Sequence, residues 1–162
     1  MTNKVFERAF DLLMQNEGGY VNDTNDSGGE TKYGISKRAY PHLNIRDISI
    51  EQAKEIYRRD YWDKCKCDFL PDYLSVAVFD YAVNSGIKQA IKDLQKSLGV
   101  TIDGIIGNQT IGAANSKPQR KILENYIEAR LNFLMSLKNW KIYGNGWGRR
   151  VNRVIEVCEK LI

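Results

Sequence analysis

Apolar side chains recur at intervals of three and four residues along most of this chain, and this spacing restricts its fold more than any other feature. Phe6, Phe10 and Leu13 show it first, and such spacing places side chains on one face of an α-helix. No segment has a long strand pattern. The sequence therefore predicts a mainly α fold, with a first helix ending near Glu17 and further helices over about 50–62, 74–85, 87–98, 109–115, 118–139 and 147–161.

Residues 18–36 interrupt the helical pattern with glycine, asparagine and aspartate, which are typical of turns. We expect a loop or a small β-hairpin there, directly after the first helix. Helix ends are marked elsewhere: Ser49 with Gln52 forms a capping box, and Gly86 and Gly99 are expected C-caps.

The length of 162 residues predicts one compact unit, or one domain with a small appendage. The net charge of +4 favours encounter with an anionic polymer such as a cell wall, a membrane surface or nucleic acid, without choosing among them. No apolar run is long enough to span a membrane. Because charges occupy the first eight residues, where a signal peptide needs an apolar centre, we expect a soluble protein without its own export signal.

The cysteines predict neither a metal site nor a disulfide. Cys65 and Cys67 are separated by one residue, which suits neither the usual zinc spacing nor a mutual disulfide. Cys158 has the apolar spacing of a small core residue, and the single histidine, His42, lies in a turn-like segment. We therefore expect reduced thiols, no metal and no organic cofactor.

Glu17 extends the apolar face of the first helix, four residues after Leu13, and Gly18 and Gly19 follow it. Partial burial and the free carbonyls at a helix C-terminus both disfavour an ionised carboxylate, so the pKa of Glu17 is expected to rise. A raised pKa suits a general acid that works near neutral pH. The alternative from periodicity alone is a glutamate exposed at a frayed helix end.

Hydrolysis of a glycosidic bond needs a proton donor and a second group that attacks or orients water. Asp26 lies nine residues after Glu17, and Thr31 lies five residues further, in a glycine-rich stretch that can fold back over the helix end. Together they could supply a carboxylate and a hydroxyl to hold one water molecule.

Three ordered blocks of this sequence resemble glycoside hydrolase family 108, which comprises bacterial and phage N-acetylmuramidases, some of them labelled secretion activators. The blocks are Asn-Glu-Gly-Gly-Tyr-Val-Asn-Asp at 16–23 with Gly-Gly-Glu-Thr-Lys-Tyr-Gly-Ile-Ser at 28–36, Phe-Asp-Tyr-Ala-Val-Asn-Ser-Gly at 79–86, and residues 94–110, which are similar to the family's C-terminal peptidoglycan-domain pattern. The resemblance implies a lysozyme-like helical fold.

The family's Glu-Gly-Gly-Tyr motif carries the glutamate regarded as catalytic, so the resemblance implies that Glu17 is the general acid. The spacing of Glu17, Asp26 and Thr31 is also similar to the Glu-Asp-Thr arrangement of T4-type phage lysozymes, which have five residues rather than four in the second gap. This second similarity implies that Asp26 is the partner carboxylate and Thr31 a water-orienting hydroxyl. Asp23 competes with Asp26, although its context also suits a turn. Glu30 is a third candidate, with a solvated loop residue as its alternative.

Aromatic and amide side chains suit sugar recognition, because a ring covers the apolar face of a pyranose and an amide pairs with hydroxyl and N-acetyl groups. Tyr20, Tyr33 and Asn84 are the candidate substrate-binding residues. The alternatives are core positions for the two tyrosines and a backbone cap for the asparagine. Asp80 lies on an apolar helix face, so it is expected to be either paired and structural or part of a cleft.

Residues 144–150, Gly-Asn-Gly-Trp-Gly-Arg-Arg, predict a turn that opens the last helix with an exposed basic pair. In the simpler interpretation Trp147 anchors the helix and the arginines are solvated. In the other, Arg149 and Arg150 contact an anionic cell-wall polymer.

The leading functional prediction is a lysozyme that cleaves the β-1,4 bond between N-acetylmuramic acid and N-acetylglucosamine. Residues 1–92 are predicted to form the catalytic region, and residues 93–162 a peptidoglycan-binding-like region packed into the same lobe. One alternative is a non-hydrolytic peptidoglycan-binding or secretion-promoting protein. Another is a small basic nucleic-acid binder, for which Arg149, Arg150 and Arg153 form no recognisable docking motif.

The expected partners are peptidoglycan glycan strands, together with a pore protein for export, and we expect a monomer that neither binds nucleic acid nor inserts stably into a membrane. Synthesis in the cytoplasm is expected, with action on the cell wall after release or unconventional export.

Overall fold

The structure is a computed structural model that describes residues 3–16, 19–22 and 29–162. Its helices are α1 (Lys4–Asn16), α2 (Ile50–Tyr57), α3 (Asp72–Ser85), α4 (Ile87–Leu98), α5 (Asn108–Ser116), α6 (Gln119–Ser136) and α7 (Trp140–Glu159). Three strands, β1 (Val21–Asn22), β2 (Glu30–Lys32) and β3 (Ile35–Ser36), form one antiparallel sheet in the order β1-β2-β3. The expected mainly α fold with a small β element after the first helix is confirmed.

Helix α3 is the centre of the molecule. Every residue from Tyr73 to Ala82 is buried, because α3 contacts α1, α4, α6 and α7. A helix that is apolar all round is stable only when neighbours cover every face. Next to it, a cluster of aromatic rings joins α1 to α2 and α3, made up of Phe6, Phe10, Tyr57, Trp62 and Phe79.

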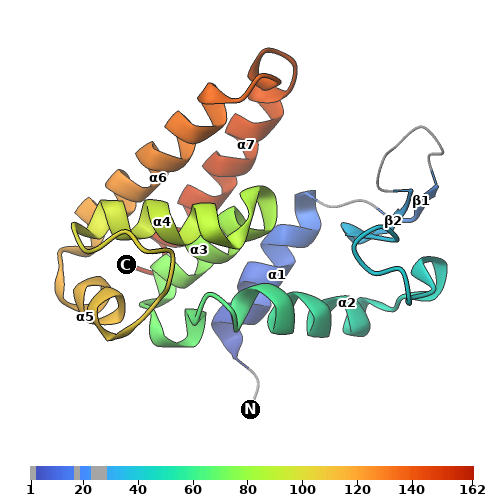
Figure 1. The fold of residues 1–162 in the computed structure, drawn as a ribbon, viewed down its shortest axis with the longest axis horizontal. Helices are drawn as coiled ribbons and strands as arrows, with labels where there is room; N and C mark the ends of the chain where they lie inside the picture. Colours follow the sequence, from blue (N-terminus) through green and yellow to red (C-terminus); the bar gives the residue numbers. More distant parts are fainter. Residues whose placement is uncertain (1–2, 17–18, 23–28) are drawn as a thin grey trace.

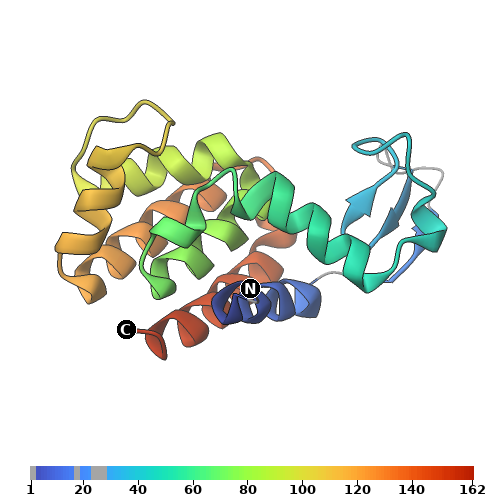
Figure 2. The same cartoon turned by 90° about the horizontal axis from the view of Figure 1, so that it is seen from below.

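The sheet lies at one end of the molecule, away from most of the helices, in both Figure 1 and Figure 2. The short 3₁₀ turn η1 (Ile45–Asp47) packs against β2, and α2 then leads back into the helical body. Helices α6 and α7 form an antiparallel hairpin, and α7 contacts α1 as well as α6. None of the helices in the described ranges is both long and apolar enough to span a membrane.

Most predicted helix ends are confirmed. Ser49 accepts a hydrogen bond from the backbone N–H of Gln52, and the Gln52 side chain accepts one from the N–H of Ser49, which completes the capping box. Gly86 and Gly99 end α3 and α4 with positive φ angles, as the C-cap prediction requires. The helix expected over 50–62 continues beyond α2 as a π-helical turn, η2 (Arg58–Trp62).

The turn predicted over residues 144–150 is wrong, because α7 begins at Trp140 and runs through all three glycines of this segment. Each glycine disfavours a helix by only about 1 kcal/mol. Packing outweighs this cost: Val151, Val154 and Cys158 are buried, and α7 lies against α3 and α6. At Gly144 the indole of Trp140 occupies the space that a side chain would fill.

Candidate active site

The C-terminal end of α1 is tied to α7 by a hydrogen bond. Arg153 Nη1 donates to Oδ1 of Asn16, the last residue of α1, at 2.7 Å. The Asn16 amide also donates to the carbonyl of Leu12 at 3.2 Å. The residue that precedes Glu17 in sequence is therefore held from two sides. Glu17 itself lies outside the described residues.

A buried ion network joins α3 to α6 and α7. Arg130 Nη2 lies 2.8 Å from Oδ2 of Asp80, and Arg150 Nε lies 3.1 Å from the same oxygen. The side chains of Arg130 and Asp80 are 1% and 2% exposed and that of Arg150 is 12% exposed, so the pairing takes place almost entirely in the interior. Burial alone raises the pKa of Asp80, but the two guanidinium charges outweigh it and hold the pKa below its usual value. The prediction that Asp80 is paired is confirmed.

Arg130 connects this network to Asn84. Its Nη2 donates to Asn84 Oδ1 at 3.2 Å, and its guanidinium lies 5.1 Å from the ring centroid of Tyr81. The ring partly compensates for Nε and Nη1, which have no hydrogen-bond partner within the described residues. Asn84 is half-buried in the last turn of α3, so its amide oxygen faces the network.

Arg150 departs from both interpretations of the basic pair in the sequence. It is paired with Asp80 through two hydrogen bonds, of 3.1 and 3.3 Å, rather than solvated. Arg149 is exposed, as expected. Consecutive side chains on a helix point about 100° apart, so Arg150 faces α3 while Arg149 faces solvent. Which of the two faces α3 depends on how α7 packs, which the sequence does not encode locally.

Thr31 occupies the central strand of the sheet. It pairs with Val21 on β1 and with Ser36 on β3, and directly opposed residues share one face of a sheet. Glu30 and Lys32 lie on the other face, where Lys32 Nζ donates to the carbonyl of Arg46 in η1 at 2.9 Å. The face that carries Thr31 is thus the one that η1 does not cover.

Tyr20 and Glu30 form a pair within the sheet region. The Tyr20 hydroxyl donates to Glu30 Oε2 at 2.6 Å, and the Arg46 guanidinium lies 5.3 Å from the Tyr20 ring centroid. The hydrogen bond to Glu30, together with burial, raises the pKa of Tyr20. The alternative of Glu30 as a solvated loop residue is wrong, because it is half-buried on β2 and has a tyrosine partner.

Tyr33 forms the turn between β2 and β3. Its φ of 53° and the φ of 78° at Gly34 correspond to the two-residue turn that fits the twist of an antiparallel hairpin. The Tyr57 hydroxyl donates to the Tyr33 carbonyl at 2.7 Å and fixes the turn on α2. The backbone of Tyr33 therefore has a structural role, whereas the proposed sugar contact of its half-buried ring stays a prediction.

A pocket of about 170 Å³ lies between the sheet and the end of α3. Ser36, the strand partner of Thr31, lines it on one side, and Val83, the residue before Asn84, lines it on the other. The rest of the lining includes three tyrosines, Tyr40, Tyr57 and Tyr61. The structure thus brings the neighbours of Thr31 and Asn84 to one cavity. Asp26 and its competitor Asp23 lie outside the described residues.

The site contacts of Arg130, Arg153 and the pocket tyrosines are not among the features predicted from the sequence. Arg130 carried a detectable signal, because it lies four residues after Tyr126 on a helix face that is otherwise apolar. A charge on such a face requires a buried partner of opposite charge. Asp80, which lies on the apolar face of another predicted helix, is the residue in the sequence that fits this requirement. Arg153 and the tyrosines carried no comparable signal.

The three cysteines are free and buried. Burial raises the pKa of the Cys67 thiol well above its usual value and that of Cys158 to about 12, so neither is a reactive thiolate near neutral pH. The core position predicted for Cys158 is confirmed. In the described part of the chain, no three His, Cys, Asp or Glu side chains are grouped as metal ligands.

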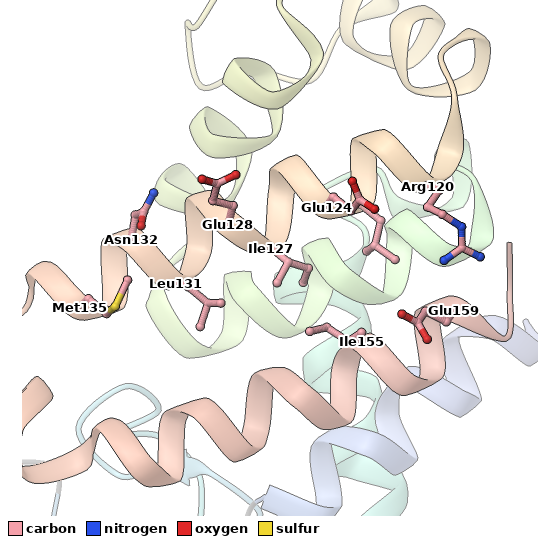
Figure 3. Close-up of a pocket in the computed structure, with 10 residues that line it drawn as sticks. Arg120, Glu124, Ile127, Glu128, Leu131, Asn132, Met135, Ile155 and Glu159 are labelled. Carbon is pink, nitrogen blue, oxygen red and sulfur yellow. The ribbon is translucent and has the colours of Figure 1, made fainter.

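A separate groove of about 470 Å³ lies between α6 and α7. Ile127 and Leu131 point from α6 toward α7, where Ile155 lies opposite, with Arg120 and Glu159 at one end and Met135 at the other (Figure 3). None of the predicted site residues lines this groove. The candidate active site is therefore the region around the end of α1, the pocket and the sheet.

Comparison with known proteins gives matches along most of the chain. A family model described as Glycosyl hydrolase 108 matches residues 10–86, and one described as Predicted Peptidoglycan domain matches residues 89–152. The solved structure of SagA from Brucella abortus is similar with 34% sequence identity and a TM-score of 0.86, covering 96% of this chain and 94% of that chain. No curated protein sequence matches the chain.

Proposed function

This chain belongs to the glycosyl hydrolase 108 family of glycoside hydrolases and acts on peptidoglycan, and from that premise we propose that it is an N-acetylmuramidase. The bond cleaved is the β-1,4 linkage between N-acetylmuramic acid and N-acetylglucosamine. The observation that carries this proposal is the family match over residues 10–86, since this range contains the Glu-Gly-Gly-Tyr motif at 17–20.

Glu17 is the proposed general acid, which donates a proton to the departing glycosidic oxygen. The hydrogen bond between Arg153 and Asn16 supports this role, because it fixes the residue before Glu17. A catalytic carboxyl must stay within a few tenths of an ångström of its working position, and a tie between the preceding residue and a second helix favours this.

Asp26 is the proposed partner carboxylate and Thr31 the proposed water-orienting hydroxyl. The position of Thr31 on the face of the sheet that η1 leaves open supports its role. Attack of this water on the face opposite Glu17 inverts the anomeric centre if the two carboxyl groups are roughly 6.5–9.5 Å apart.

Tyr20, Tyr33 and Asn84 are the proposed substrate-binding residues. None of the three lines the pocket of about 170 Å³, but two of them adjoin it in sequence, because Gly34, the residue after Tyr33, and Val83, the residue before Asn84, line it together with Tyr40, Tyr57 and Tyr61. Aromatic rings suit a pyranose, and an amide such as that of Asn84, whose Oδ1 accepts a hydrogen bond from Arg130, suits an N-acetyl group.

The test of this proposal is the Glu17→Gln variant, which removes the acidic proton and keeps the side-chain shape. We expect clearing of a cell-wall suspension to fall about 10²- to 10⁴-fold, the range for a lost general acid. Asp26→Asn is expected to reduce clearing more than Asp23→Asn. Undiminished clearing by Glu17→Gln refutes Glu17 as the general acid. A larger loss of clearing in Asp23→Asn than in Asp26→Asn identifies Asp23 as the partner carboxylate.

Mass spectrometry of the fragments released from purified peptidoglycan identifies the bond. New reducing ends on N-acetylmuramic acid are the expected result, and reducing ends on N-acetylglucosamine contradict the proposed specificity.

A second candidate function is peptidoglycan binding without hydrolysis, which the family match over residues 89–152 favours. Sedimentation of the protein with cell walls, without release of reducing ends, is the outcome that distinguishes it. In either case we propose the cell wall as the place of action.

A further inference from the structure

Three aromatic side chains line the first two turns of α7. Trp140, Tyr143 and Trp147 are three and four residues apart, which places them on one side of the helix. The ring centroids of Trp140 and Trp147 are 6.0 Å apart, and those of Tyr143 and Trp147 are 5.7 Å apart. We call these three residues the aromatic ladder.

Glycines leave room beside the aromatic ladder. A Cβ atom at Gly144 would lie 2.8 Å from Cε2 of Trp140, so only glycine allows this indole to lie against the helix. At Gly148 a Cβ atom would meet nothing within 4 Å. Glycine is among the least favourable residues inside a helix, and three of them within five positions leave α7 with a surface of rings and few competing side chains.

The aromatic ladder is partly exposed. The Tyr143 side chain is 53% exposed, while Trp140 and Trp147 are half-buried against the core. The tryptophans are therefore fixed by packing, and Tyr143 offers ring surface to a ligand. Rigid aromatic surface of this kind binds at a low cost in conformational entropy.

The charged residues on both sides of the aromatic ladder in sequence are all positive. From Ala129 to Ile155 the sequence contains no aspartate or glutamate and six lysine and arginine residues. Lys138, Lys141 and Arg149, which are exposed, lie closest in sequence to the rings. A ligand for this surface therefore combines sugar-like rings with negative charge, as the glycan strands of peptidoglycan do with their carboxylate-bearing peptides.

The aromatic ladder lies on the same helix as two residues that contact the candidate active site. Arg150, which pairs with Asp80, follows Trp147 by three residues, and Arg153, which holds Asn16, follows it by six. From there the ladder extends along α7 toward the α6–α7 turn, the upper end of the hairpin in Figure 1.

We propose that the aromatic ladder of α7 is a platform that binds the glycan strand of peptidoglycan beyond the catalytic end of α1. Pyranose rings stack on Tyr143 and Trp147, Trp140 supports the ring of Trp147, and the surrounding lysines and Arg149 attract the carboxylates of the strand. This inference rests on the proposed function, because it names a second contact for the same substrate.

Binding is tested in the full-length Glu17→Gln background, so that hydrolysis does not remove the ligand. Tyr143→Ala is expected to raise the apparent Kd for purified, insoluble peptidoglycan about 3- to 10-fold, the range expected for one lost ring contact. Ile142→Ala is the matched control, since Ile142 is 73% exposed and lies next to Tyr143 but outside the ladder. Its Kd is expected to change by less than about twofold.

A second pair of variants tests whether binding depends on the position of the Trp140 indole, which supports the other rings of the aromatic ladder. Gly144→Ala drives a Cβ atom into the Trp140 indole and is expected to weaken binding, while Gly148→Ala gains the same helix propensity in open space and leaves binding unchanged. Circular dichroism checks that α7 stays helical in both. A tetramer of N-acetylglucosamine, followed by tryptophan fluorescence, is the soluble probe.

Equal Kd values for Tyr143→Ala and Ile142→Ala overturn the proposal. So does Tyr143-dependent binding of a single-stranded thymidine oligonucleotide without binding of the glycan, since aromatic and basic residues can also stack bases. These outcomes concern binding, whereas clearing of cell walls by the Glu17→Gln protein refutes the catalytic role of Glu17, so failure of the proposed function is distinguishable from failure of this inference.

Discussion

Asp80 is a carboxylate in the middle of the central helix, and its two arginine partners come from α6 and α7. Taking three charges out of water is unfavourable, and only their mutual attraction and hydrogen bonds offset this cost. Removal of one partner leaves the other charges buried without compensation. Arg130 of the network also donates a hydrogen bond to Asn84, a candidate substrate-binding residue. Asp80 therefore affects both the stability of the fold and the position of a candidate site residue.

At neutral pH we expect Asp80→Asn to lower the free energy of unfolding by about 3–5 kcal/mol, because two arginines lose their counter-charge in the interior. Urea denaturation measures the change. Glu7→Gln is the control: Glu7 pairs with Lys54 at 2.8 Å, but its side chain is 35% exposed, so the loss is about 1 kcal/mol or less. Equal effects of the two variants contradict a structural role for the network.

The stability difference between the parent protein and Asp80→Asn is expected to depend on pH, and its direction follows from the pKa of Asp80. Although burial raises the pKa of Asp80, the two arginines lower it further, so its folded value lies below the unfolded one. The folded protein then binds fewer protons, and the contribution of Asp80 is complete above about pH 4, its unfolded pKa. As the pH falls through the folded value, the stability difference between the parent protein and Asp80→Asn is expected to shrink. A constant difference down to acid pH contradicts this.

The β2–β3 hairpin is the element that presents Thr31. Its two-residue turn needs positive φ at both Tyr33 and Gly34, and the hydroxyl of Tyr57 holds it on α2. A tyrosine with positive φ is strained, and the structure accepts this strain directly beside the pocket. The register of this short hairpin sets which residues face the pocket.

Gly34→Ala is expected to destabilise the protein by about 1–2 kcal/mol, because an alanine at φ 78° is strained. We also expect wall clearing to fall further than the loss of folded protein explains, since the turn fixes β2. Thermal unfolding and a clearing assay provide the two values. Gly112→Ala in α5 is the control, because its Cβ meets open space and a helical alanine stabilises by about 0.5–1 kcal/mol. Normal clearing by Gly34→Ala means that the turn does not position Thr31.

At the scale of the whole molecule, the two stretches matched by the family models are packed into each other. Helix α3, from the first stretch, is covered by α4, α6 and α7, which lie largely in the second, and Arg153 of α7, one residue beyond that stretch, holds the end of α1. The division at residues 92 and 93 stays a prediction about function. The first stretch needs the helices of the second to bury the apolar surface of α3.

A fragment of residues 1–92 is therefore expected not to fold cooperatively, because the apolar surface of α3 and the charge of Asp80 become exposed to water or unpaired. Circular dichroism during heating measures this, with the full-length protein as reference. A sharp thermal transition of the fragment contradicts the expectation and identifies the first stretch as an independent domain.

The sequence by itself determined the features that depend on near neighbours in the chain. The ends of α3 and α4 at Gly86 and Gly99 and the capping box at Ser49 follow from backbone hydrogen bonding over a few residues, so local patterns predict them. The motif around Glu17 likewise identified the family, because it is contiguous in sequence.

Only the tertiary structure decided the features that depend on partners far along the chain. Arg150 pairs with Asp80 across 70 residues, and Arg153 binds Asn16 across 137. The start of α7 at Trp140 belongs to the same class: glycines favour a turn locally, but packing against α3 and α6 stabilises the helix by more than the glycines cost. Local propensities amount to about 1 kcal/mol per residue, whereas a buried ion pair or a packed helix face involves several, so distant contacts decide where the two conflict.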